Sequence, residues 1–194
     1  MSEEQVLDEF RSCGALLEGH FKLSSGKHSG HYLQCARVLM NPARAERLAK
    51  LTCAKIPTDL IEQIDVVVSP AMGGIIMGQE VGRVLGRDAM FLERPEGVFH
   101  LRRGFALEQG AKVLMVEDVV TTGLSSREAI AAVERDGGKV VAECALIDRS
   151  EGSADLGVPF FPLIAVNFPT YDESSIPAEL ASVAIAKPGS RKEE

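Results

Sequence analysis

The fold is decided by residues 112 to 125, which read KVLMVEDVVTTGLS. Residues 113–116 are an unbroken apolar run, which is typical of a strand buried on both faces. The Glu117–Asp118 pair follows, then two apolar residues, a turn rich in hydroxyl groups, and a helix predicted from about residue 125 to residue 135. Open α/β sheets bind their ligands at the carboxyl ends of the strands, so we expect this turn to be a binding site.

Strands and helices alternate on both sides of this stretch. An apolar helix that ends at Gly86 and the 125–135 helix each connect two apolar runs. Strands are predicted at residues 65–69, 89–92, 112–116 and 140–147, with an edge strand at 160–168. Repeated strand–helix–strand units imply a mainly parallel sheet. The predicted fold class is therefore α/β, with a mainly parallel sheet flanked by helices.

The two ends of the chain have a different pattern. A helix is predicted over residues 2–13, with Ser2 and Gln5 forming a capping box. Short apolar runs in residues 15–40 predict two strands joined by a turn, and Asn41 is placed to cap the next helix. We expect a single domain over residues 1–194, made of a core (about 41–150), a small hood from both chain ends (about 1–40 and 150–186) and a loose tail (187–194).

Composition and charge argue against several classes of protein. Hydrophobic residues make up 45% of the chain and charged residues 25%, as in ordinary globular proteins. The net charge of −7 disfavours a nucleic-acid partner. No apolar run approaches the roughly 18 residues of a membrane helix, and the N-terminus lacks the apolar region of a signal peptide. The 4 cysteines contain no CxxC pair, which indicates free thiols in a reducing compartment, the cytoplasm.

The turn after the acidic pair suits a sugar phosphate. Backbone N–H groups and hydroxyls of residues 121–125 can bind a phosphate at a helix N-terminus. Carboxylates beside a bare phosphate would repel it, but they can accept hydrogen bonds from the hydroxyls of a vicinal diol. The alternative is that these side chains only cap the helix. The ordered string favours a ligand site, and it is neither a Walker loop nor a Rossmann motif.

This string resembles the phosphoribosyl pyrophosphate motif of the type I phosphoribosyltransferases, and the resemblance covers most of the chain. It implies that the acidic pair binds the ribose hydroxyls and takes part in catalysis, while the loop holds the 5-phosphate. The donor-binding residues are then Arg94, Glu117, Asp118, Val119, Val120, Thr121, Thr122, Gly123, Leu124 and Ser125. The fold it implies is a parallel sheet flanked by helices beneath a variable hood.

Three further segments resemble the orotate-specific members of this family. Their hood signature is resembled by FKLSSG (21–26) together with SGHY (29–32). The segment whose arginine binds the orotate carboxylate is resembled by LIDRSEG (146–152). The tail of one bacterial branch is resembled by KPGSR (187–191). The resemblance implies that Thr121 and Arg149 bind orotate.

Arg149 also has a physical argument of its own. It follows a buried strand at the same sheet edge as the phosphate loop, and a guanidinium there can bind a planar carboxylate through two hydrogen bonds. The alternative is a salt bridge with the neighbouring Asp148 or Glu151.

The segment SPAMGG (69–74) follows a predicted strand and opens a helix, so it is a second candidate anion site. The resemblance assigns its last part to pyrophosphate: Ala71, Met72, Gly73 and Gly74. Gly73 and Ser24 stand where better-known members often carry lysine, so the pyrophosphate charge must be met by Lys27, or by backbone amides and Mg²⁺. The alternative is a strand-to-helix turn eased by glycine.

Residues 93–110 are predicted to be a mobile loop. In the family such a loop closes over the neighbouring subunit's active site and supplies a catalytic lysine, but here no lysine lies between Arg94 and Gly110. Arg102 and Arg103 are the predicted catalytic substitutes, and loop 94–104 is expected to be shared across a homodimer. A solvated β-hairpin is the alternative.

The resemblance implies transfer of ribose 5-phosphate from phosphoribosyl pyrophosphate to a ring nitrogen of orotate in pyrimidine (UMP) biosynthesis. Mg²⁺ would be bound mainly through substrate oxygens, and no protein metal site is expected, since His28 and His31 would point to opposite faces of a strand. A purine-base phosphoribosyltransferase, which would lack the Arg149 segment, stays open. So does a non-catalytic nucleotide-binding regulator of the same fold, although the net charge argues against it.

Overall fold

The computed structural model describes residues 1–23 and 25–186. The chain forms two compact units. The core unit comprises residues 39–166, and the hood unit comprises residues 2–38 together with the chain from residue 167 onward. Ser24 and the KPGSR segment lie outside the described residues.

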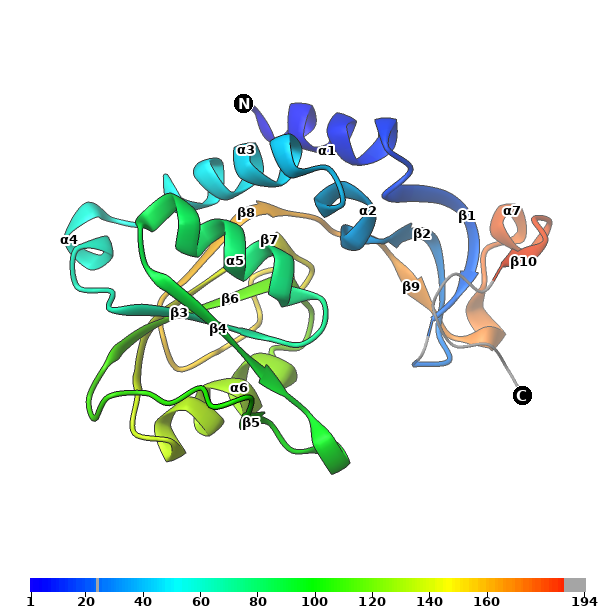
Figure 1. Cartoon of the computed structure of the whole chain (residues 1–194). Coiled ribbons are helices and arrows are strands. Elements are labelled where there is room, and N and C mark those ends of the chain that lie inside the picture. Colours follow the sequence, from blue (N-terminus) through cyan, green and yellow to red (C-terminus); the bar gives the residue numbers. More distant parts are fainter. Residues whose placement is uncertain (24, 187–194) are drawn as a thin grey trace. The chain divides into compact units, whose positions relative to one another are not determined.

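A six-stranded sheet forms the centre of the core unit (Figure 1). Its order is β5-β4-β3-β6-β7-β8, and every neighbouring pair is parallel except β4 and β5. The strands are β3 (Val66–Pro70), β4 (Asp88–Glu93), β5 (His100–Leu101), β6 (Lys112–Val120), β7 (Lys139–Asp148) and β8 (Phe160–Ala165). The predicted α/β class with a mainly parallel sheet is confirmed. Strand β8 extends the core unit to residue 166, past the predicted end at about 150.

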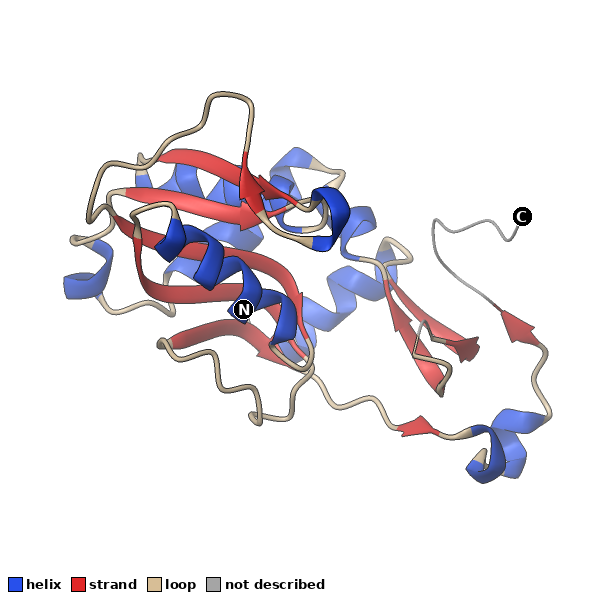
Figure 2. Cartoon of the chain, turned by 90° about the horizontal axis from the view of Figure 1, so that it is seen from below, coloured by secondary structure: helices blue, strands red, loops and turns tan. Residues whose placement is uncertain are grey.

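Helices cover both faces of this sheet. In Figure 1, α3 and α5 lie on one face and α6 on the other, and Figure 2 shows the same layers from below. The bounds are α3 (Pro42–Cys53), α4 (Thr58–Ile61), α5 (Gly74–Leu85), η1 (Pro95–Gly97) and α6 (Leu124–Arg135). Helix α2 (Cys35–Leu39) belongs to the hood unit except for its last residue. The Asn41 side chain accepts a hydrogen bond from the Arg44 N–H, which confirms the predicted cap of α3.

The space between α6 and the sheet is filled by apolar side chains. Val113 and Met115 of β6 pack with Ala129 and Val133 of α6, and all four are 0% exposed. Such burial provides most of the driving force for folding. It also fixes the position of the loop that joins β6 to α6.

The hood unit is built on a small sheet of order β10-β1-β2-β9. Its elements are α1 (Glu3–Ser12), β1 (Leu16–Lys22), β2 (His28–Leu33), β9 (Thr170–Tyr171), η2 (Glu173–Ser175), α7 (Ala178–Ala181) and β10 (Ile185–Ala186). The capping box of Ser2 and Gln5 is present, and the two predicted strands form the hairpin β1–β2.

The histidines of the hood make separate contacts. His28 Nδ1 lies 2.7 Å from His20 Nε2 in a buried hydrogen bond. The His31 ring stacks on Phe168 with the ring centroids 4.5 Å apart. His20, which carried no sequence argument, is therefore part of the packing of the hood.

Strand β6 is longer than predicted. It continues to Val120 because β7 pairs with it as far as Val120 opposite Asp148. The acidic pair lies inside the strand rather than after it.

In the part of the chain that the structure describes, no helix is long and apolar enough to span a bilayer.

Candidate active site

The acidic pair lies near the carboxyl end of the central strand β6. Glu117 is 7% exposed, and its Oε2 accepts a hydrogen bond of 3.3 Å from the Asp118 N–H. The Asp118 Oδ1 accepts one of 3.0 Å from the Val119 N–H. Both carboxyl groups are thus held by the backbone of their own strand.

Burial raises the pKa of both carboxyl groups. The pKa of Glu117 rises to about 8, first because of its burial and then because of the charges of Asp118 and Glu143, while the charge of Arg94 opposes the rise. Burial also raises the pKa of Asp118, against its hydrogen bonds from the backbone. A ligand that donates hydroxyl hydrogen bonds, or that develops positive charge, would favour the ionised forms of both groups. Perturbed carboxyl groups of this kind are typical of functional sites.

The predicted phosphate loop, residues 121–125, connects β6 to α6 with most of its side chains exposed. Gly123 adopts a left-handed conformation (φ 72°) as the N-cap of α6. Gly123 has no side chain to cap the helix, but the Thr122 Oγ1 accepts a hydrogen bond of 3.4 Å from the Leu124 N–H, as the helix-cap alternative expects of the loop threonines. The carboxyl groups of Glu117 and Asp118 accept from N–H groups of their own strand. The Arg127 Nη1 donates to the Thr122 and Asp155 carbonyls at 3.2 and 2.9 Å, and it holds the loop from outside.

The predicted pyrophosphate segment, residues 71–74, lies directly against the acidic pair. It follows β3, which runs parallel to β6. A Cβ atom built on Gly73 would lie 2.6 Å from the Asp118 Oδ1. One built on Gly74 would lie 2.9 Å from the Val116 carbonyl oxygen and 3.3 Å from the Glu117 Oε2. A side chain at position 74 would collide with the backbone of β6, and one at position 73 would displace the Asp118 carboxylate.

Arg149 follows β7 beside the start of the phosphate loop. Its backbone N–H donates to the Val120 carbonyl at 2.8 Å, and Asp148 pairs with Val120 in the register of the sheet. The Asp148 Oδ1 accepts a hydrogen bond from the Ser150 N–H at 2.7 Å. The structure thus brings together the predicted orotate residues Thr121 and Arg149, since each comes directly after one of these paired strands.

The predicted mobile loop begins as a short hairpin, in which β4 and β5 pair with Leu92 opposite Leu101 and Glu93 opposite His100. The alternative prediction, a β-hairpin, therefore describes this first part of the segment. Glu93 holds both predicted catalytic arginines, Arg103 at 2.6 Å and Arg102 at 3.2 Å. Arg94 forms an ion pair with Glu128 of α6, and its guanidinium lies 4.0 Å from the centroid of the Phe99 ring. The charge of Arg94 lowers the pKa of Glu117, so Arg94 acts on the acidic pair, whereas Arg102 and Arg103 form ion pairs with Glu93.

Lys27 lies in the hood, in the turn between β1 and β2. Its Nζ is 3.7 Å from the Asp172 Oδ1. Its predicted role toward pyrophosphate remains a prediction.

Two buried polar residues escaped the sequence analysis. Glu143 of β7 is 0% exposed, and its Oε1 accepts a hydrogen bond of 2.6 Å from the Ser126 hydroxyl in the first turn of α6. The signal was present, because Glu143 is the single charged residue within the apolar run 140–147. Charged residues are almost never fully buried without a partner.

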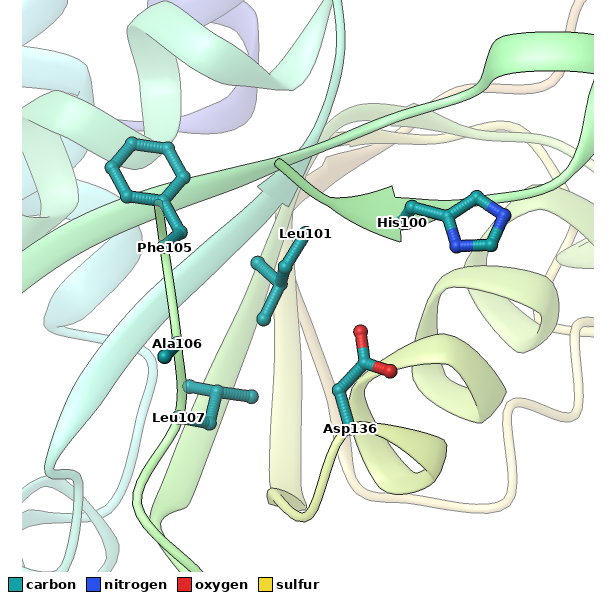
Figure 3. Close-up of a pocket in the computed structure, with 6 residues that line it drawn as sticks. All are labelled: His100, Leu101, Phe105, Ala106, Leu107 and Asp136. Atoms are coloured by element: carbon teal, nitrogen blue, oxygen red, sulfur yellow. The ribbon is translucent and has the colours of Figure 1, made fainter. Parts of the chain in front are cut away.

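A cavity of about 390 Å³ lies beside Asp136, at the C-terminal end of α6 (Figure 3). It is lined by His100 and Leu101 of β5, by residues 105–107 and by Asp136. Its lining residues from β5 and from residues 105–107 lie in the predicted mobile loop 93–110, but none of them is a predicted binding or catalytic residue.

Among the described residues, no group of three or more His, Cys, Asp or Glu side chains is arranged to hold a metal ion. The side-chain oxygens at this edge of the sheet are hard ligands of the kind that Mg²⁺ prefers, so their chemistry fits a Mg²⁺-bound donor.

Comparisons with known proteins agree with this geometry. A family model described as "Phosphoribosyl transferase domain" matches residues 35–159. The orotate phosphoribosyltransferase of Erythrobacter litoralis is 68% identical over 191 residues, covering 98% of this chain and 99% of that protein. That of Novosphingobium aromaticivorans is also 68% identical, covering 98% of each.

Solved structures show the same fold. The orotate phosphoribosyltransferase of Aeropyrum pernix superposes with a TM-score of 0.70 at 26% identity, covering 83% of this chain and 93% of that one. An adenine phosphoribosyltransferase superposes with a TM-score of 0.64 at 17% identity, covering 80% and 99%, which shows the fold alone. The chain belongs to the phosphoribosyl transferase family, among the orotate phosphoribosyltransferases.

Proposed function

We propose that the chain transfers ribose 5-phosphate from phosphoribosyl pyrophosphate to a ring nitrogen of orotate, giving orotidine 5′-phosphate and pyrophosphate. One observation carries the proposal: the backbone hydrogen bond from Arg149 to Val120 places a guanidinium-bearing residue beside the phosphate loop and the acidic pair. The proposed site for a carboxylate-bearing base would thereby adjoin the proposed site for a sugar phosphate.

The donor would lie along the edge formed by β3 and β6. Its 5-phosphate would accept hydrogen bonds from backbone N–H groups and hydroxyls of residues 121–125. Its ribose hydroxyls would donate to Glu117 and Asp118, which favours their ionised forms. The pyrophosphate would lie against the backbone of residues 71–74.

Catalysis would depend on charge more than on proton transfer. As the bond to pyrophosphate breaks, positive charge develops at the anomeric carbon, and the ionised Glu117 and Asp118 stabilise it. Arg149 orients orotate by its carboxylate, so that the ring nitrogen faces that carbon. Negative charge grows on the pyrophosphate, and the loop arginines Arg94, Arg102 and Arg103 are the cations offered to it. Mg²⁺, bound mainly by substrate oxygens, would neutralise part of the same charge.

The loop arginines would act after a rearrangement. In this structure Glu93 forms ion pairs with Arg102 and Arg103, and Glu128 forms an ion pair with Arg94. The side chains of both catalytic arginines are more than half exposed, so these ion pairs are weak and can exchange for pyrophosphate. We propose that loop 94–104 closes over the site of a second copy in a homodimer.

The compartment proposed for this activity is the cytoplasm. The described cysteines, Cys13, Cys35, Cys53 and Cys144, are all free. Free thiols persist in a reducing environment.

The purified chain can be assayed with phosphoribosyl pyrophosphate, Mg²⁺ and a panel of bases: orotate, uracil, adenine, guanine and hypoxanthine. We expect pyrophosphate release that depends on orotate and far slower release with the other bases. Preference for a purine would favour a purine phosphoribosyltransferase instead. No release with any base, by protein that binds the donor, would favour a non-catalytic nucleotide-binding regulator.

A further inference from the structure

Glu143 is a carboxyl group at the centre of the core unit. It is 0% exposed in the middle of β7, opposite Met115 of β6 and Phe160 of β8. Its single hydrogen-bond donor among the described side chains is Ser126, which is 2% exposed, and its Oε2 is buried without a hydrogen-bond partner in the same part of the chain. Burial raises the pKa of Glu143 to about 7, and the hydrogen bond from Ser126 opposes the rise.

Stability does not explain this residue. A buried carboxyl group with one unsatisfied oxygen costs free energy, and an apolar side chain of similar volume would cost less. The carboxyl group of Glu143 contacts α6 through Ser126, and the phosphate loop leads into the first turn of this helix. It also acts on Glu117 through its charge. Both connections lead to the donor site.

We propose that Glu143 is a positioning residue for the donor: it anchors the first turn of α6 through the buried hydrogen bond from Ser126. The inference rests on the proposed function and deepens it. Ser126 directly follows the loop 121–125, so the hydrogen bond fixes the direction in which the first N–H groups of α6 point. A phosphate bound there gains most when these N–H groups are already oriented.

The two connections predict two separable effects. Losing the hydrogen bond should loosen the loop and weaken the binding of the 5-phosphate. Losing the charge should make Glu117 easier to ionise, because an ionised Glu143 opposes the ionisation of Glu117. The groups that act electrostatically on Glu117 are Asp118 of the same strand, Glu143 of β7 and Arg94 at the end of β4. Glu143 itself responds to its burial and to Ser126 of α6.

The test uses one variant for each connection. Ser126→Ala removes the hydrogen bond and keeps the charge, whereas Glu143→Gln removes the charge and keeps an oxygen that can accept from Ser126. Glu134→Gln is the matched control, since Glu134 is exposed on the same helix. For each variant, kcat and both KM values are measured across the pH range, alongside a thermal melt and calorimetric titration with ribose 5-phosphate.

We expect Ser126→Ala to raise the KM for the donor about tenfold and to leave the KM for orotate unchanged. The affinity for ribose 5-phosphate should fall to a similar extent, about tenfold or about 1.4 kcal/mol of binding free energy. Glu143→Gln should shift the acid limb of kcat/KM for the donor to lower pH, and the control should do neither. A native KM for the donor and native ribose 5-phosphate binding in Ser126→Ala would overturn the inference. If the wild type lacks orotate-dependent activity, the proposed function fails. In that case the titration with ribose 5-phosphate alone tests the inference. The inference is overturned if Ser126→Ala binds ribose 5-phosphate as tightly as the wild type does, or if the wild type does not bind it.

Discussion

The Asp118 carboxylate occupies the space in which a side chain of Gly73 would begin. A Cβ atom at position 73 would lie 2.6 Å from the Asp118 Oδ1 and 2.8 Å from its carboxyl carbon, and real Cβ atoms essentially never come within 3.0 Å of another group. The missing side chain at position 73 and the acidic pair are therefore coupled.

Gly73→Ala should impair the enzyme without unfolding it. The new methyl group must displace the Asp118 carboxylate, so ribose positioning suffers, and we expect kcat/KM for the donor to fall at least about tenfold, or about 1.4 kcal/mol of transition-state stabilisation. The measurement is steady-state kinetics with a thermal melt. Gly30→Ala is the control, because a Cβ there meets nothing closer than 4.0 Å. Native kinetics in Gly73→Ala would show that Asp118 can move freely.

Arg149→Ala should affect orotate far more than the donor. The guanidinium is expected to bind the carboxylate of the base, and losing a charge-assisted contact should cost about 2–4 kcal/mol. We predict a large rise in the KM for orotate and little change in the KM for the donor. Arg83→Ala, which removes an exposed arginine of α5, should leave both unchanged. Equal effects on the two substrates would contradict the assignment of Arg149.

The shared loop predicts complementation between two defective chains. The double variant Arg102→Ala, Arg103→Ala should be poorly active, and so should Asp118→Asn. Mixed under conditions that exchange subunits, the two should regain activity, because one site of each hybrid dimer combines a native loop with a native phosphate site.

The recovery has an upper bound. Random exchange makes half of the dimers hybrids with one intact site each, so up to about a quarter of the native activity should return. Demonstrated exchange without recovery would mean that each loop serves its own chain or takes no part in catalysis.

The acidic pair should make stability depend on pH. The pKa of Glu117 is raised to about 8 in the folded chain from an ordinary value of 4.5, so its contribution is fully present below pH 4.5 and is lost as the pH rises through about 8. The loss is at most about 1.4 kcal/mol per pH unit. Glu117→Gln should therefore melt at a less pH-dependent temperature than the wild type between about pH 5 and pH 9. An unchanged pH dependence would show that Glu117 ionises as freely in the folded chain as in the unfolded one.

The central part of the fold was predictable because its signals are local. The apolar runs that became β3, β6 and β7 are buried on both faces, and the glycine at position 86 ends α5 in a left-handed conformation. The end of β6 was not predictable, because its last four residues belong to the strand only through their pairing with β7. Such pairing joins residues far apart in the sequence, and no local pattern records it.

The same distinction holds for the site. The loop 121–125 and Arg149 could be placed from adjacent residues, whereas the hydrogen bond between Ser126 and Glu143 joins a helix and a strand through residues 17 positions apart. The close contact of Gly73 with Asp118 likewise depends on the parallel pairing of β3 with β6. The ion pairs of Glu93 with Arg102 and Arg103 could not be predicted for another reason. The sequence around an exposed arginine does not indicate which carboxylate it contacts.

The most direct test of the account is the turnover of Glu117→Gln and Asp118→Asn, measured beside their melting temperatures. Each variant keeps the shape of its side chain and removes the charge that is expected to position the ribose and stabilise the anomeric carbon. We predict a fall in kcat of at least about a hundredfold, near 2.7 kcal/mol, with melting temperatures at or above that of the wild type. Near-native turnover in both variants would contradict the account, because the carboxyl groups at the end of β6 would then have no catalytic role.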